Sequence, residues 1–139
     1  MRDEVAPRAA MSIDFKNNRI RIHKNTLHLI GNPEYILFLV NPIENTIAIM
    51  QGDSSDPRAR RIAFTSTAGE KSSVLCSKLL VQGLQSIHSE WQDNRTYRLY
   101  GELIEGRSIV KFCVKESVLI GENLENYYDR IPSSFTNSR

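Results

Sequence analysis

The fold is decided by the stretch Arg19-Ile-Arg-Ile-His-Lys-Asn-Thr-Leu-His-Leu-Ile-Gly31. Its first five residues alternate polar and apolar side chains, a pattern that predicts a strand with one buried face. Leu27 and Ile30 then lie three residues apart, and Gly31 precedes an Asn-Pro pair. We therefore expect one or two helical turns that end at this glycine.

Further strands flank this stretch. Upstream, Ile13 and Phe15 alternate with polar residues ahead of an Asn-Asn turn signal. Downstream, the run from Tyr35 to Val40 is dense in strand-forming residues, and a polar turn leads from it into the segment from Thr46 to Met50. These last two segments predict a hairpin.

The second half of the chain repeats this order of parts. Residues 51–61 are charged and contain Gly, Ser and Pro, which predicts an exposed linker. After the linker we expect, in order, a strand at 61–65, a polar loop at 67–73, a helix from Ser77 to Trp91, strands at 97–103 and 109–114, and a short helix from Ser117 to Arg130.

The resulting fold class is α+β and β-rich, with two strand-helix-hairpin units, at 13–50 and 61–115, packed as a pseudo-twofold barrel or sandwich. A duplication is physically reasonable because each unit alone buries too little apolar surface for stability. The alternative is that helix-then-hairpin recurs without shared origin. We expect one globular domain over 11–132, with disordered tails at 1–10 and 133–139.

Composition and charge restrict the class of protein. The 139 residues include 18 Lys+Arg and 16 Asp+Glu, for a formal net charge of +2, and 40% are hydrophobic. The longest apolar run is far short of the roughly 20 residues that span a bilayer, and the charged N-terminus lacks the apolar segment of a secretory signal. With only two cysteines, we expect a soluble cytoplasmic protein with reduced thiols and no membrane partner.

Residues 19–50 resemble a known family. The stretch from Arg19 to Gly31, followed by Tyr35-Ile-x-x-x-Val40 and Ile47-Ala-Ile49, resembles the swapped-hairpin half-barrel of AbrB-like transition-state regulators. Proteins similar to MraZ carry two such units in one chain of about this length, which suits the second half here. The resemblance implies an intertwined β-rich barrel, an obligate oligomer and DNA contacts from Arg19, Arg21 and Lys24.

A basic stretch forms the first candidate site, for DNA or another anion. Its cations are Lys16, Arg19, Arg21 and Lys24, with no acidic residue among them. On a strand, Arg19 and Arg21 project from the same face, so their guanidinium groups are suited to hold adjacent phosphates. The alternative is the solvated outer face of an amphipathic strand, where basic residues only keep the sheet soluble.

Arg98, Tyr100 and Arg107 form the second candidate site, for a small ligand. Tyr100 offers a stacking surface, and the two arginines are partners for an anion. Tyr100 lies on the opposite strand face from Tyr97, which we expect in the core together with Trp91. The alternative is that the aromatic residues close the core and bind nothing.

The sequence contains no recognisable catalytic or metal-binding motif. It has no nucleophile elbow, Gly-rich phosphate loop or CxxC, and its three histidines have no Cys or acidic neighbour at ligand spacing. We therefore expect a protein that is not an enzyme and that binds neither a metal nor a cofactor.

The main hypothesis for its function is a homo-oligomeric DNA-binding transcription regulator that holds the phosphate backbone of DNA. The rival hypothesis is a small inhibitor that sequesters an anionic ligand or blocks a protein target, as mobile-element anti-defence proteins do.

Overall fold

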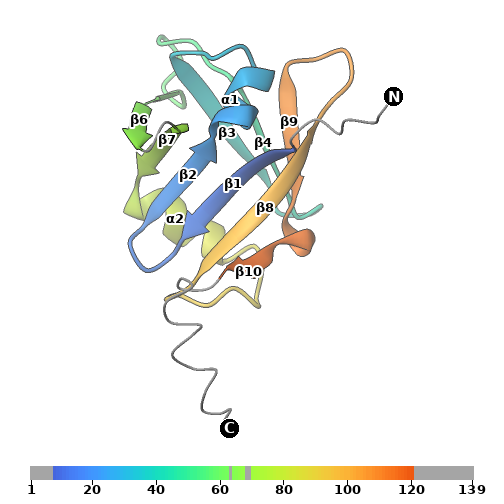
Figure 1. Ribbon diagram of the computed structural model, residues 1–139. Coiled ribbons are helices and arrows are strands. Elements are labelled where there is room, and N and C mark those ends of the chain that lie inside the picture. The colour runs from blue at the N-terminus through green and yellow to red at the C-terminus, as the bar shows by residue number, and fades with distance from the viewer. Residues whose placement is uncertain (1–7, 63, 68–69, 121–139) are drawn as a thin grey trace, which may run out of the picture.

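The computed structural model describes residues 8–62, 64–67 and 70–120, and it is dominated by strands (Figure 1). The strands of the first half are β1 (Ala9–Asp14), β2 (Arg19–His23), β3 (Tyr35–Asn41) and β4 (Thr46–Gln51). Those of the second half are β5 (Arg60–Arg61), β6 (Phe64–Thr67), β7 (Glu70–Cys76), β8 (Thr96–Leu103), β9 (Ile109–Cys113) and β10 (Val118–Ile120). The helices are α1 (Lys24–Leu29), α2 (Lys78–Gln85) and the 3-10 turn η1 (Val114–Glu116).

Within the described ranges, ten strands form one sheet with antiparallel pairing throughout. Its order is β5-β3-β4-β9-β8-β1-β2-β7-β6, and β10 pairs with β8 beyond the end of β9. The two ends of this order, β5 and β6, are separated in the chain only by residues 62 and 63. The sheet therefore curls back on itself, because one short length of chain borders both β3 and β7.

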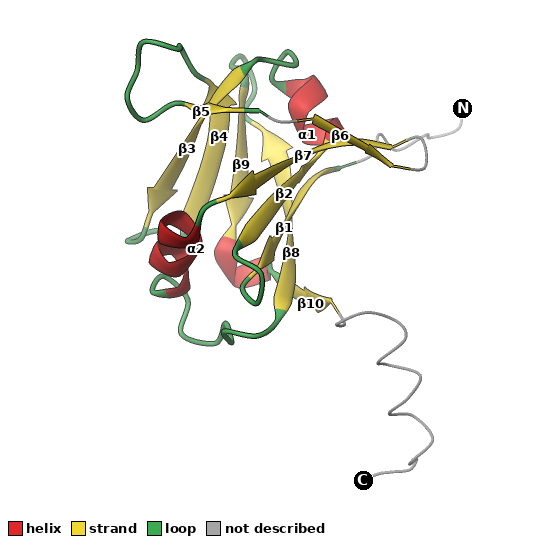
Figure 2. Ribbon diagram, turned by 90° about the vertical axis from the view of Figure 1, so that its left-hand side faces the viewer, coloured by secondary structure: helices red, strands yellow, loops and turns green. Residues whose placement is uncertain are grey.

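The curled sheet encloses the core, and each helix covers one end of it (Figure 2). Helix α2 lies between the lower ends of β3 and β2 in Figure 2, and directs Val81 and Leu84 into the core. Helix α1 lies at the other end and buries Leu27. Because residues alternate along the strands, the inward-facing side chains of five strands fill the space between them, including Ile13, Ile20, Ile22, Ile47, Ile49, Leu99, Val110 and Phe112.

An aromatic cluster forms the part of the core next to the β1–β2 turn. The ring of Phe15 lies 5.3 Å from that of Trp91 and 5.9 Å from that of Tyr97, measured between centroids. The indole Nε1–H of Trp91 donates to Ser117 Oγ at 2.9 Å, and Tyr97 Oη accepts from the backbone N–H of Gln92 at 2.9 Å. Both polar groups are thus paired although the rings are buried, as stable burial of Trp and Tyr requires.

A buried hydroxyl joins α1 to β1. Thr26 Oγ1 accepts a hydrogen bond from the backbone N–H of Ala10 at 2.8 Å and donates one to the Ala10 carbonyl at 2.9 Å. Ala10 pairs with β8 on one edge, whereas the pairing of β1 with β2 begins only at Met11. Thr26 therefore takes the place of β2 at this point, since it supplies hydrogen bonds to the N–H and carbonyl of Ala10 on the side of β1 that β2 does not reach.

The β-rich α+β class predicted from the sequence is confirmed. The strand at 19–23, the helical turns after Lys24 and the hairpin of β3 and β4 all lie where the residue patterns place them. The predicted strands at 97–103 and 109–114 correspond to β8 and β9. Strands β2 and β8 alternate polar and apolar residues, and β3 is a dense run of strand-forming residues, which explains why local patterns were sufficient.

Three predictions in the middle of the chain differ from the structure. The single strand expected at 61–65 is two strands, because β5 ends at Arg61 and β6 begins at Phe64. The expected polar loop at 67–73 is in part strand, because β7 begins at Glu70 and pairs along its length with β6 and β2. The helix expected from Ser77 to Trp91 ends at Gln85. Ser86 Oγ donates to the Gly83 carbonyl at 2.9 Å, and serine and glycine both have low helix propensity, which favours an end to the helix here. Trp91 is buried in the core but lies in the loop after the helix.

The ends of the chain also differ from prediction. Ala9 and Ala10, assigned to the N-terminal tail, belong to β1, where they pair with Gly101 and Tyr100, and both are buried. The helix expected from Ser117 to Arg130 begins instead as β10, which pairs with β8. Residues 1–7 of the first tail, residues 121–130 of that helix and the tail at 133–139 lie outside the described residues.

Candidate anion-binding site

Three arginines meet on the outer face of β2, β1 and β8, the face toward the viewer in Figure 1. Arg19 and Arg21 point outward because Ile20 and Ile22 of the same strand are fully buried. Arg98 points outward from β8 for the same reason, between buried Tyr97 and Leu99. The predicted projection of Arg19 and Arg21 from one strand face is confirmed.

The pairing of β1 with both neighbours places these arginines side by side. Ser12 of β1 lies opposite Arg21 on one side and opposite Arg98 on the other. One row further along, Asp14 lies opposite Arg19 and Thr96 in the same way. Residues more than 70 positions apart in the chain therefore share one surface, with a short polar side chain of β1 between them.

These rows enclose a pocket of about 180 Å³. Its lining residues are Ser12, Asp14, Arg19, Arg21, Val74, Thr96, Arg98 and Ile120. The charged groups among them are three guanidinium groups and one carboxylate, so the pocket has a formal charge of +2 (+3 − 1). A net positive, hydroxyl-lined pocket of this kind is suited to an anion.

Asp14 is the acidic member of the pocket, and it is held by its own turn. Its carboxylate accepts hydrogen bonds from the backbone N–H groups of Lys16 and Asn17, each at 3.0 Å, and from Asn17 Nδ2 at 2.9 Å. Arg19 Nη2 lies 3.5 Å from Asp14 Oδ2. Burial, the largest single influence, raises the pKa of Asp14, but the bonds from Asn17, the charge of Arg19 and the Lys16 N–H together hold that pKa below its usual value.

Arg98 differs from the other two arginines in its burial. Its Nε atom is buried, and it has no hydrogen-bond partner among the residues that the structure describes. Buried donors without a partner are uncommon, because leaving such a group unsatisfied costs free energy. Arg98 thus presents an unused donor in a pocket that already carries excess positive charge.

The remaining cations of the basic stretch lie at the two ends of β2. Lys16 is exposed in the turn between β1 and β2, and Lys24 is exposed at the first residue of α1. Neither residue lines the pocket. The stretch predicted as one basic site is therefore a central pair of arginines with a lysine beyond each end of the strand.

The three residues proposed as a ligand site line three different hollows. Arg98 is in the pocket described above, whereas Tyr100 lines a hollow of about 350 Å³ in which the Arg8 guanidinium carbon lies 5.1 Å from the tyrosine ring centroid. Arg107 lies in the turn between β8 and β9, beside Met50 and Ile109. Tyr100 does lie beside Arg98 on the strand face opposite Tyr97, as predicted.

Sequence reasoning missed the part that β1 plays in the site. Ser12 and Asp14 were not singled out, and Arg98 was assigned to a separate site from Arg19 and Arg21. The alternation of Ser12, Ile13 and Asp14 was the available signal, because it places both polar residues on the outer face. The pairing of β1 with β8 had no such local signal.

No described helix has the length and apolar character needed to cross a membrane. Within the same residues, no group of three or more His, Cys, Asp and Glu side chains is placed to hold a metal ion.

The chain was also compared with known proteins. No family model, curated protein or solved structure matches it.

Proposed function

We propose that this protein is a non-enzymatic regulator that binds the phosphate backbone of duplex DNA through the pocket of Arg19, Arg21 and Arg98, as a homo-oligomer. The observation that carries the proposal is the buried, unpartnered Nε of Arg98 in a pocket of net positive charge. A phosphate oxygen seated there accepts from that Nε, and neighbouring guanidinium groups offset its charge.

The size of the pocket favours a phosphate of a polymer over a whole small ligand. Its volume of about 180 Å³ is below the roughly 300–1,000 Å³ typical of sites that enclose small organic molecules. Arg19 and Arg21 are exposed on an outer sheet face, where a duplex can approach. Lys16 and Lys24 extend the positive charge past both ends of β2, a strand about 17 Å long at 3.4 Å per residue.

The proposal includes kinship with the AbrB and MraZ half-barrel regulators and an origin by duplication. Support comes from the order of elements, which is hairpin, short helix, hairpin in each half: β1-β2-α1-β3-β4, then β6-β7-α2-β8-β9. Corresponding strands of the two halves also pair with each other, β2 with β7 and β4 with β9. In this view the units at 13–50 and 61–115 are equivalent halves of one curled sheet.

Binding of labelled duplex DNA, followed by fluorescence anisotropy at low ionic strength, tests the proposal. The variant Arg98→Met should weaken binding by about tenfold or more, because it removes a charged donor from the phosphate. The control Lys78→Met also removes one positive charge, but from a residue that does not line the pocket, and it should change the affinity less than twofold. Each phosphate that the pocket neutralises should contribute about −0.9 to the slope of log K against log salt.

Asp14→Asn is the complementary variant, because it removes the carboxylate from the pocket and should tighten binding. The proposal fails if the native protein does not bind duplex DNA at low salt, or if Arg98→Met binds as well as Lys78→Met. Absence of DNA binding together with a rise in melting temperature on adding nucleotides or cyclic dinucleotides would favour the rival role, sequestration of an anionic ligand.

A further inference from the structure

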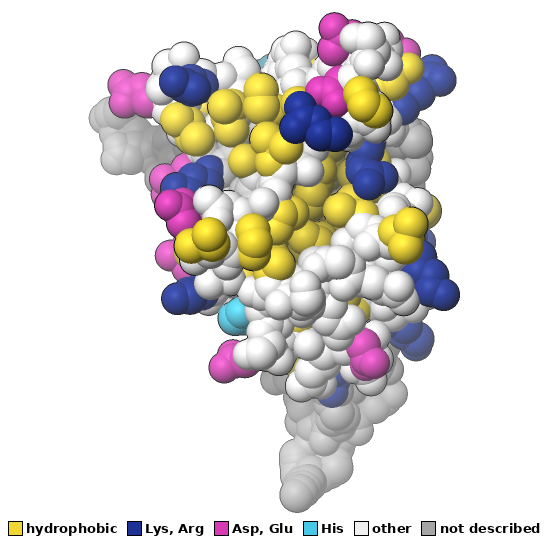
Figure 3. All heavy atoms as spheres, turned by 180° about the vertical axis from the view of Figure 1, so that it is seen from behind, with side chains coloured by type: hydrophobic (Ala, Val, Ile, Leu, Met, Phe, Trp, Pro, Cys, Tyr) yellow, Lys and Arg dark blue, Asp and Glu magenta, His cyan; other side chains and the backbone are white. Residues whose placement is uncertain are grey.

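The side of the sheet remote from the anion pocket has an apolar outer face on β3, β4 and β9, seen from behind in Figure 3. The register brings its side chains together: Leu37 lies opposite Met50, and Met50 lies opposite Ile109. In the next row Leu39 lies opposite Ala48, and Ala48 lies opposite the exposed Lys111, which bounds the apolar residues on β9. Hydrophobic side chains gather over this region in Figure 3. We call Leu37, Leu39, Ala48, Met50 and Ile109 the apolar face.

Strand β3 has the composition of a strand that is covered on both sides. Its seven residues, Tyr35–Asn41, carry no charge. Ile36, Phe38 and Val40 pack into or against the core, so the intervening Leu37 and Leu39 belong to the outer face. Strands with one solvated face alternate apolar and polar residues, whereas continuous apolar runs are typical of strands buried on both faces. The composition of β3 is therefore that of a strand covered on both faces. The chain itself already covers Leu37, which is 9% exposed, but it leaves Leu39 half-buried and open to a partner.

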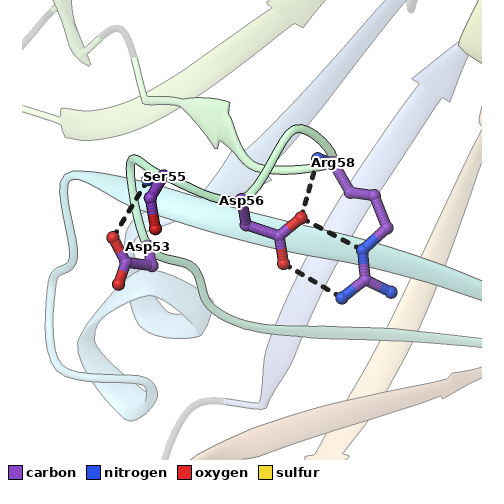
Figure 4. Close-up of polar contacts among 4 residues, drawn as sticks. All are labelled: Asp53, Ser55, Asp56 and Arg58. Carbon is purple, nitrogen blue, oxygen red and sulfur yellow. Dashed lines mark hydrogen bonds and ion pairs between the residues drawn. The ribbon is translucent and has the colours of Figure 1, made fainter.

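An acidic hollow borders the apolar face on the β3 side. Glu34, Asp53 and Asp56 line it, together with Leu37 of the face. Figure 4 shows how the loop holds two of these carboxylates. Asp56 is bound twice by the Arg58 guanidinium, at 3.0 and 3.1 Å, whereas the Asp53 carboxylate accepts from the backbone N–H of Ser55 at 3.0 Å. Glu34 pairs with Arg61 at 3.6 Å. Among the described residues, Asp53 is the carboxylate of this hollow with no ion pair.

A cation borders the same face on the β9 side. Arg107 lies in the exposed turn before β9, in a hollow that it shares with Met50 and Ile109 of the apolar face. It forms no ion pair with any residue in the described ranges. Gln51 lines both this hollow and the acidic one, so the cation and the free carboxylate flank the same end of the face.

We infer that a second copy of this chain packs on the apolar face, with Arg107 of each copy entering the acidic hollow of the other beside Asp53. If the twofold axis runs parallel to β4, the β9 side of one copy lies over the β3 side of its partner. The end of the face next to Gln51 then meets the same end of the partner, which brings Arg107 of one copy to Asp53 of the other. The contact is then self-complementary in charge, as a twofold interface requires, and it forms two equivalent ion pairs around a desolvated centre. This dimer supplies a specific interface for the homo-oligomer of the proposed function. It rests on the proposed function only for its biological purpose, which is DNA binding.

Sedimentation velocity, with the mass checked by light scattering, tests the inference through a charge swap. The native protein should be a dimer whose dissociation constant rises with salt. Arg107→Glu and Asp53→Lys should each raise that constant by about tenfold or more, because each places like charges across the interface. The double variant, carrying both changes, should restore the dimer. The control Lys16→Glu makes an equal charge reversal in the β1–β2 turn, far from this face, and should leave the dimer intact.

The inference is overturned if the native protein is a monomer at all concentrations, if the single variants dimerise as the native protein does, or if the double variant stays monomeric. Circular dichroism of each variant shows whether it is folded. If one of the single variants is unfolded, the oligomeric state of the double variant decides the question. DNA binding is measured separately on the folded Arg107→Glu monomer, which keeps the whole anion pocket. A dimer that binds no DNA would refute the proposed function while leaving this interface standing.

Discussion

Replacing Gly101 by alanine should destabilise the protein, because the sheet has no room for a methyl group at this position. Gly101 of β8 lies directly opposite Phe112 of β9. An added Cβ would stand 2.8 Å from two ring carbons of Phe112 and 2.9 Å from the Lys111 carbonyl oxygen, whereas ordinary contact begins at 3.4 Å. Phe112 is fully buried, so its ring has no free space to enter.

The expected cost is that of overpacking a tight core, about 1 to 3 kcal/mol in the free energy of unfolding. For a chain of this length each kcal/mol corresponds to about 3 to 5 °C, so the melting temperature should fall by about 3 to 15 °C. Gly83→Ala is the matched control. Gly83 is an exposed helical glycine of α2 with no atom within 4 Å of an added Cβ, so alanine should stabilise there by about 0.5 to 1 kcal/mol.

Urea denaturation followed by circular dichroism measures both effects. In the double variant Gly101→Ala with Phe112→Leu, the smaller side chain removes the ring carbons that clash, so the combined loss should be less than the sum of the two single losses. If Gly101→Ala unfolds at the same urea concentration as the native protein, or at a higher one, the proposed close approach of β8 and β9 is refuted.

The remaining predictions concern a buried hydroxyl and an acidic turn. Thr26→Val keeps the shape of the side chain but leaves the backbone of Ala10 without its two bonds, so we expect a loss of about 2 kcal/mol by urea denaturation, and a smaller loss for Thr26→Ser, which keeps the hydroxyl. The pKa of Asp14 is lowered on folding, so its ionised form stabilises the fold above the unfolded pKa of 3.8, and that contribution disappears as pH falls through the lower folded value. The stability difference between the native protein and Asp14→Asn should therefore be largest near neutral pH and shrink below pH 3.8; an equal difference at both ends of the range would contradict this.

The sequence predicted those parts of the fold that a local period encodes. Residues 19–23 alternate strictly, and β2 has one buried and one exposed face as a result. The run from Tyr35 to Val40 was recognised as a strand, but its unbroken apolar character was not interpreted as a sign of two covered faces. The helix from Ser77 was predicted too long, because apolar residues that reach the core from a loop can mimic helical spacing.

The candidate site could be predicted only in part, because it is made by pairing between distant strands. The basic character of Arg19 and Arg21 was evident from the sequence, and so was the exposed face of Arg98. Nothing local indicates that β1 lies between β2 and β8, which is the fact that joins these residues in one pocket. A stretch without acidic residues was also misleading, because Asp14, just before it, folds back to within 3.5 Å of Arg19.

The position of β1 has a consequence for how the protein is made. It is the first described strand of the chain, yet it lies in the interior of the sheet between β2 and β8. Its Ala10 pairs with Tyr100, 90 positions later, so at a synthesis rate of roughly 5–20 residues per second one edge of β1 stays unpaired for about 5 to 18 s. A chain that stops before β8 cannot close its sheet, and it leaves an apolar strand open to aggregation and to proteolysis.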